Sequence, residues 1–197
     1  MKEDKSKWDE KYKGGVFLCG KEANRFLIDN IHLLPKGRVL DIAAGEGRNS
    51  AFFAKHGFEV DAIDISKMGL KKAKRLAREE GAEINFIKAD LENYQIEENA
   101  YDVIANFNYL QRDLIPQIKR GLKIGGAVIF ETYLIDQSAL SSGPKNPDHL
   151  LGHNELLGFF KGFRVILYRE GMYRERGLKK AIAGIIARKY EKRRNKL

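Results

Sequence analysis

The stretch that decides the fold runs from Val39 to Ser50 and reads VLDIAAGEGRNS. An apolar, strand-like run passes directly into small residues and then into a segment of helical composition. Small residues let a backbone approach a ligand closely, and a helix N-terminus presents unpaired N–H groups and the positive end of its dipole. The stretch therefore predicts a nucleotide-like cofactor lying across the carboxyl ends of parallel strands.

Downstream of this stretch, short β-branched runs alternate with helical stretches, as is typical of parallel strands joined by crossover helices. The last of the expected helices should end at Gly121 and be followed by a turn over Lys123–Gly126. The expected strands are 38–43, 59–64, 84–90, 101–107 and 127–133, and the expected helices are 48–56, 67–80 and 110–122.

The C-terminal part departs from this alternation. Residues 163–171 and 179–190 both have strand-like composition and only a short segment separates them, although the alanines of the second also suit a helix. Parallel neighbours need a crossover of a dozen or more residues, so these two predict an antiparallel hairpin. The expected fold class is α/β, with a doubly wound, mostly parallel seven-stranded sheet that ends in an antiparallel C-terminal hairpin.

Length and composition indicate one globular domain. The chain has 197 residues, of which 43% are hydrophobic and 32% charged, which is enough for one α/β core and too little for two. We expect a single domain with four parts. These are an N-terminal helical lid (1–37), a cofactor-binding core (38–133), a substrate-side insert (134–160) and a C-terminal hairpin with a basic tail (161–197).

Charge and cysteine content bear on the cellular location of the protein. Cys19 is the only cysteine, no apolar run reaches the roughly 20 residues that span a bilayer, and the N-terminus is charged. We therefore expect a cytoplasmic protein with no membrane partner. The net charge of +9 is concentrated in residues 67–78 and 188–196. Such charge runs are usually solvated faces, and a polyanion-binding surface is the alternative.

A dinucleotide site is the nearest competitor for the first loop, because Gly45-x-Gly47-x-x-Ser50 is close to the GxGxxG pattern. Two features favour another cofactor. Asp41 lies four residues before Gly45, and the small residues begin at Ala43. A carboxylate in this loop repels a pyrophosphate, whereas it can help to hold a cationic amino group.

The loop resembles the first motif of class I S-adenosylmethionine (AdoMet)-dependent methyltransferases, which reads acid-x-Gly-x-Gly-x-Gly. Here it is Asp41-x-Ala43-x-Gly45-x-Gly47, with alanine in place of the first glycine. Within that superfamily, residues 45–50 and 57–60 together with Asp64 are similar to the tellurite-resistance-type enzymes. The resemblance covers about residues 38–133. It implies a Rossmann-like methyltransferase fold, AdoMet as the cofactor and a soft acceptor such as a thiol or chalcogenide.

The remaining cofactor positions follow the strand ends. Asp64 ends the second strand, roughly 20 residues after the glycine loop, where a carboxylate accepts hydrogen bonds from ribose hydroxyls. Stabilisation of a helix N-terminus is the alternative role for Asp64, and Asp61 inside the strand is less suited to the ribose. The resemblance implies that Asp90 and Leu91 contact adenine. The full expected set is Asp41, Ala43, Gly45, Gly47, Asn49, Asp64, Ile65, Asp90, Leu91 and Asn106.

The acceptor side is less determined, because in-line methyl transfer mainly requires alignment of the nucleophile, methyl and sulfur. Residues 106–109, Asn-Phe-Asn-Tyr, resemble the (Asp/Asn)-Pro-Pro-(Tyr/Phe) motif of amine and amide methyltransferases but lack both prolines. An amine acceptor is therefore not favoured. Asn108 and Tyr109 are alternatively expected to line the mouth of the pocket.

A polar insert, 137–153, follows the fifth strand and is expected to lie over the acceptor site. His149 and His153 are candidate general bases, with a surface histidine that has no catalytic role as the alternative for each, and Tyr109 is a third catalytic candidate. No metal is expected, because no cysteine or Glu-x-x-His pattern accompanies the histidines. Trp8 and Tyr12, one helical turn apart, suggest a lid that closes over the cofactor.

Three functions remain open at this point. The favoured one is methyl transfer to a small-molecule acceptor. The second is methylation of RNA or protein, with the basic helix and tail as a docking surface for nucleic acid. The third is a dinucleotide-dependent oxidoreductase. The oligomeric state is not indicated by the sequence.

Overall fold

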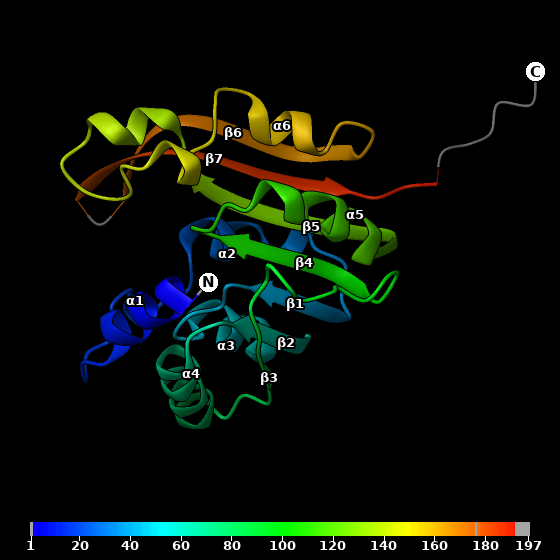
Figure 1. Ribbon diagram of the computed structural model, residues 1–197. Helices are drawn as coiled ribbons and strands as arrows, with labels where there is room; N and C mark the ends of the chain where they lie inside the picture. Colours follow the sequence, from blue (N-terminus) through cyan, green and yellow to red (C-terminus); the bar gives the residue numbers. More distant parts are fainter. Residues whose placement is uncertain (1, 176, 192–197) are drawn as a thin grey trace, which may run out of the picture.

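The computed structural model describes residues 2–175 and 177–191, which form one seven-stranded sheet flanked by helices (Figure 1). The strand order is β3-β2-β1-β4-β5-β7-β6. The strands are β1 (Arg38–Ile42), β2 (Glu59–Asp64), β3 (Asn85–Lys88), β4 (Tyr101–Phe107), β5 (Leu122–Tyr133), β6 (Arg164–Glu175) and β7 (Leu178–Arg188).

Helices cover both faces of this sheet. Each crossover between the parallel strands β1, β2 and β3 is made by a helix, and shorter helical turns occupy the connections near the carboxyl ends of β4 and β5. The α-helices are α1 (Lys2–Tyr12), α2 (Arg25–Asn30), α3 (Arg48–Lys55), α4 (Lys67–Glu80), α5 (Ile115–Gly121) and α6 (Glu155–Phe159). The 3-10 helices are η1 (Ile31–Leu33), η2 (Arg112–Leu114), η3 (Ile135–Ala139) and η4 (Pro147–His149).

The chain reverses its direction of travel across the sheet at β1. β1 pairs in parallel with β2 on one side and with β4 on the other. The chain builds β2 and β3 outward in one direction and then returns to place β4 and β5 in the other. Ligands of open α/β sheets bind outside the carboxyl ends of the strands at such a switch point. We therefore expect a ligand site at the loops that follow β1, β2 and β4.

The predicted C-terminal hairpin is confirmed. β7 pairs antiparallel with both β5 and β6, so it runs against the rest of the sheet. Its alanines belong to a strand because residues 181–187 are buried without interruption, with both faces of the strand covered. Small residues suit that position, where a strand lies inside a sheet between two layers.

Two hydrophobic clusters hold the helices to the sheet. On one face, Phe26 of α2 and Phe53 of α3 pack against Val39 and Val103 of the central strands. On the other face, Ile118 of α5 and the residues after β5 pack against the opposite sides of the same strands. Successive side chains of a strand point to opposite faces of the sheet, so each central strand contributes residues to both clusters, as expected for a sheet covered on both faces.

Several expected boundaries are wrong. The helix expected over 110–122 is shorter, since η2 precedes it, Pro116 lies in its first turn and β5 already begins at Leu122. The expected Lys123–Gly126 turn lies within β5, where the pairing with β4 is irregular between Tyr101 and Val103. Within the expected N-terminal helical part, the structure forms two short helices between residues 21 and 33, α2, which is capped by Asn24, and η1.

Among the described residues, no helix combines the length and apolar character needed to cross a membrane.

Candidate cofactor and acceptor site

The loop after β1 turns through three residues in the left-handed region. The φ angles of Ala43, Gly45 and Gly47 are 52°, 56° and 82°. The loop is fixed to the neighbouring strand, because the N–H of Ala44 donates to the carbonyl oxygen of Ile63 at 3.0 Å. Left-handed backbone suits glycine, and an alanine there carries a steric cost.

Two close approaches explain why the loop needs its glycines. A Cβ on Gly47 would lie 2.6 Å from the Cβ of Ala73, so glycine lets α4 pack directly against the start of α3. A Cβ on Gly45 would lie 2.8 Å from Oη of Tyr12. The phenol of Tyr12 therefore lies directly over the glycine loop.

Asp64 links the end of β2 to this loop. Its carboxylate accepts from the N–H of Gly45 and from the N–H of Ser66, each at 2.8 Å. Burial raises the pKa of Asp64, and the N–H groups of Ser66 and Gly45 oppose that shift. The buried carboxylate thus joins the loops that follow the two strands on one side of the switch point.

Asp41 is a second buried carboxylate beneath the loop. Ser50 donates its Oγ proton to Oδ2 of Asp41 at 2.5 Å. Burial raises the pKa of Asp41 to about 7, opposed by the hydroxyl of Ser50 and reinforced by the negative charge of Asp64. No ion pair joins Asp41 to a cation in the described parts of the chain, and the positive charge of Arg48 only partly offsets its burial. A positively charged ligand group would be favoured here.

The N-terminal helix covers the site. Asp9 on α1 accepts from Oγ of Ser66 at 2.6 Å and from the N–H of Met68 at 3.0 Å, which attaches α1 to the start of α4. Trp8 and Tyr12 stack with their ring centres 5.5 Å apart. Tyr12 is buried, and its burial raises the pKa of the phenol far above the ordinary value. Figure 1 shows α1 lying beside α4.

A buried ion pair anchors the segment that follows α1. Nζ of Lys72 donates to Oε1 of Glu46 at 2.7 Å and to the carbonyl oxygen of Val16 at 2.6 Å. Oε2 of Glu46 accepts from the N–H of Cys19 at 3.3 Å. Because Glu46 stands between the two glycines of the loop, it couples the N-terminal segment to the loop itself.

Other expected cofactor residues lie along the same edge of the sheet. Oδ1 of the buried Asn49 accepts from the N–H of Asn24 at 2.8 Å, and Nδ2 of Asn106 donates to the carbonyl oxygen of Tyr109 at 2.7 Å. Asp90 accepts from the N–H of Glu92 through its carboxylate at 3.1 Å. Leu91 is buried in the core and Ile65 is half-buried. Ile65 follows β2, Asp90 and Leu91 follow β3, Asn106 lies at the end of β4, and Asn49 lies in the first turn of α3.

The three catalytic candidates lie on different segments and have different surroundings. Oη of Tyr109 donates to Oε1 of Gln111 at 2.6 Å. His149 is exposed at the end of η4, and His153 is exposed and lies 2.6 Å from Oδ2 of Asp136. The hydrogen bond to Asp136 raises the pKa of His153, which disfavours the neutral imidazole that a general base requires. No group of three or more metal-ligating side chains occurs within residues 2–175 and 177–191.

Buried and partly buried hydrogen bonds fix the polar insert to the rest of the protein. Gln137 is fully buried, accepts from the N–H of Ala181 at 2.9 Å and donates to the carbonyl oxygen of Ser142, so it fixes the insert to β7. Arg112 donates to both carboxylate oxygens of Glu155 and to the carbonyl oxygens of Asp148 and Leu150. These bonds hold the backbone on either side of His149 against the loop that follows β4.

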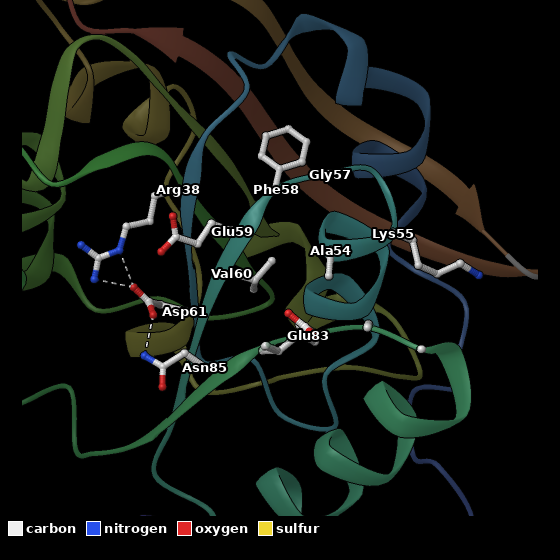
Figure 2. A pocket seen from close by; sticks show the side chains of 13 residues that line it. Arg38, Ala54, Lys55, Gly57, Phe58, Glu59, Val60, Asp61, Glu83 and Asn85 are labelled. Carbon is white, nitrogen blue, oxygen red and sulfur yellow. Dashed lines mark hydrogen bonds and ion pairs between the residues drawn. The ribbon is translucent and has the colours of Figure 1, made fainter.

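A cavity of about 950 Å³ lies at the end of the sheet where β1, β2 and β3 begin, opposite the end that carries the glycine loop (Figure 2). Its wall includes Arg38, Asp61 and Asn85, and Asp61 accepts from Arg38 at 2.9 Å and from Asn85 at 2.7 Å. Arg38 and Asn85 begin β1 and β3, and Asp61 is the third residue of β2. The carboxylate of Asp61 is thus already bound by Arg38 and Asn85, in agreement with the expectation that Asp64 rather than Asp61 binds the ribose.

Sequence reasoning missed Asp9, Ser66 and Lys72. A signal existed for Ser66, since serine before the helix over 67–80 is a typical N-cap, and its Oγ accepts from the N–H of Gly69 at 3.0 Å. Nothing in the sequence marked the other two, because their partners are 57 and 26 residues away. Such pairs become visible only when α1 and the loop after β1 pack against the N-terminal half of α4.

Comparison with known proteins identifies relatives of this arrangement. Residues 39–126 match the family described as "Methyltransferase domain". A "Probable S-adenosyl-L-methionine-dependent methyltransferase TehB" of Haemophilus influenzae is 26% identical over 157 residues, covering 74% of this chain and 52% of the relative. The "Sarcosine/dimethylglycine N-methyltransferase" of Aphanothece halophytica is 30% identical over 113 residues, covering 53% of this chain and 41% of the relative. The chain spans about half the length of the curated relatives it matches.

A solved structure shows the same fold. The crystal structure of TehB from Haemophilus influenzae superposes with a TM-score of 0.72 at 20% identity, covering 94% of this chain and 66% of that one. The chain is therefore similar in sequence to methyltransferases of the TehB type, and its fold is that of the TehB crystal structure. The expected Rossmann-like methyltransferase fold is confirmed.

Proposed function

We propose that this chain, which is similar in sequence and fold to the class I AdoMet-dependent methyltransferases, transfers a methyl group to a small-molecule acceptor by in-line displacement. The observation that carries the proposal is the buried carboxylate of Asp64, bound to the N–H of Gly45. It joins a left-handed glycine loop to the next strand end at the switch point of the sheet.

The residues present fit AdoMet. Gly45 and Gly47 leave the loop backbone without side chains, and a Cβ at either position would collide with Tyr12 or Ala73. Asp64 supplies a carboxylate for two ribose hydroxyls, and Asp41 supplies an anion for the amino group of the methionine part. When bound, AdoMet supplies a methyl group on a cationic sulfonium, whose displacement releases a neutral thioether and needs no proton donor.

The chain's own residues perform three tasks in this proposal. Asp41 and Asp64 bind and orient the two polar ends of the cofactor. Asp90 and Leu91 receive the adenine. Tyr12, stacked on Trp8 and held over Gly45, excludes water from the loop and closes the site from the N-terminal side.

The acceptor is proposed to approach from the ends of β4 and β5. Asn106 is buried at the end of β4, and the half-buried Tyr109 follows it within the same loop. Arg112 fixes the insert on both sides of His149, so we propose His149 as the residue that takes a proton from a thiol or hydroxyl acceptor. His153, ion-paired with Asp136, would help to position the insert. A relative named for sarcosine and dimethylglycine supports a small acceptor.

Binding by calorimetry tests the cofactor part. Asp64→Asn should weaken AdoMet affinity by about 1–3 kcal/mol, because buried polar partners lose a charged acceptor. Asp61→Asn is the matched control, since it alters an equally buried carboxylate on the same strand, at 4% against 6% exposure, and should leave the affinity unchanged. Equal AdoMet affinity in both variants, or binding of NADH instead of AdoMet, would refute the assignment.

Methyl transfer tests the acceptor part. Labelled AdoMet should give label transfer to members of a panel of small thiols, hydroxyl compounds and amines, and none to RNA. Transfer to RNA alone, weakened steeply by added salt, would instead support docking through the basic surface. His149→Ala should lower turnover of a thiol or hydroxyl acceptor by about 10²–10⁴ without changing AdoMet affinity.

A further inference from the structure

The outer strand of the sheet leaves one edge unpaired. β6 lies at the end of the strand order and pairs only with β7 among the described strands. None of its twelve residues is buried, whereas β7 beside it has seven consecutive buried residues. The outer edge of β6 therefore presents backbone N–H and C=O groups that can pair with another strand.

The charges on β6 alternate in a way that restricts such pairing. The strand contains Arg169, Glu170, Arg174 and Glu175. Arg169 lies over the ring of Tyr173, with its guanidinium carbon 4.7 Å from the ring centre, so odd-numbered residues here share one face. Glu170 accepts from the hydroxyl of Tyr168 on the other face. The pairing of β6 with β7 is regular from Leu167 to Glu175, which keeps this alternation intact.

Two identical antiparallel strands related by a two-fold axis must place residues of the same face opposite each other. When the axis passes through Met172, Glu170 lies opposite Arg174 of the second copy, and Arg169 lies opposite Glu175 of the second copy. Arg169 also pairs with Glu131 and Glu175 with Lys180 inside each copy, so the contacts that distinguish this register are those between Glu170 and Arg174. Opposite charges at directly opposed positions stabilise antiparallel pairs, and like charges destabilise them.

Within the bounds of β6, neighbouring registers lack this complementarity. Between residues 164 and 175, an axis through Gly171 or Tyr173 brings no opposite charges together, and an axis through Glu170 brings two glutamates together. The residues at the selected centre are also accessible. Met172 is 54% exposed, and Arg174 is exposed and makes no ion pair with the residues that the structure describes.

We propose that two copies of this chain associate through their β6 edges, antiparallel about a two-fold axis at Met172, and join their sheets. The partner is a second copy because the charge pattern of the edge is complementary to itself in one register. The glycine loop lies on the far side of β4 and β5 from β6, so both cofactor sites stay accessible in the pair. The proposal is independent of the acceptor.

Sedimentation velocity over a range of concentrations tests the pairing. Wild type should show a monomer–dimer equilibrium, and Arg174→Glu should weaken dimerisation about 30-fold, because two attractions across the axis become two repulsions. Arg164→Glu is the control, since this exposed residue on β6 lies beyond the paired segment and should leave dimerisation unchanged.

A complementary variant makes the register itself testable. Glu170→Arg should also weaken self-association, whereas an equimolar mixture of Arg174→Glu and Glu170→Arg should form a heterodimer, because the opposed charges again differ in sign. Met172→Arg, which alters an exposed side chain, should abolish association by placing two like charges at the axis. A wild type that stays monomeric, a dimer unaffected by Arg174→Glu, or a mixture that remains monomeric would each overturn the proposal.

Discussion

Asp41 should make the stability of the protein depend on pH in the neutral range. Its pKa is about 7 in the folded protein, because burial disfavours the carboxylate, against about 3.9 in an unfolded chain. Between these values the folded protein holds a proton that the unfolded chain has released. The contribution of Asp41 to stability is therefore fully present below about pH 4 and is lost as pH rises through 7.

The magnitude follows from the two pKa values. A difference of about 3 pKa units corresponds to about 4 kcal/mol, which is the free energy that Asp41 withdraws from the folded state above pH 7. Asp41→Asn keeps an acceptor for the hydroxyl of Ser50 but carries no charge. The variant should match wild type near pH 4 and exceed it by up to about 4 kcal/mol at pH 8.

Urea denaturation of both proteins from pH 4 to 8 measures this difference directly. AdoMet affinity provides the second half of the test, since an ionised Asp41 should attract the cofactor's amino group. Wild-type affinity should rise with pH up to about 7, and the affinity of Asp41→Asn should be lower and independent of pH. Parallel stability profiles for the two proteins would refute the view that Asp41 is a poorly compensated buried carboxylate.

Three further substitutions test the loop and its attachment. Ala43→Gly should stabilise the protein by about 1 kcal/mol in urea denaturation, because alanine is strained at a φ of 52°, and an unchanged midpoint would argue against that strain. Gly47→Ala should lower the melting temperature and AdoMet affinity together, since its Cβ would lie 2.6 Å from that of Ala73. Lys72→Met should cost about 3–5 kcal/mol by leaving Glu46 buried without its cation, and the double variant with Glu46→Gln should recover most of that loss.

The sequence by itself determined the order of the strands and helices through the core. The alternation of β-branched runs with helical stretches follows from local periodicity, and it correctly gave the bounds of β2, α4 and β4. The short segment before Leu178 was enough to require the antiparallel hairpin. Asp41, Gly45, Gly47 and Asp64 could be singled out because their spacing along one strand–loop–helix unit is a local property.

Tertiary structure alone decided how the site is closed and what is buried. The contacts of Asp9 with Ser66 and of Glu46 with Lys72 join residues that only packing brings together. The same holds for Gln137, which appeared to be a polar insert residue but is enclosed against β7. Burial depends on neighbours from the whole chain, so the raised pKa of Asp41 and the attachment of the N-terminal helix cannot be read from local sequence.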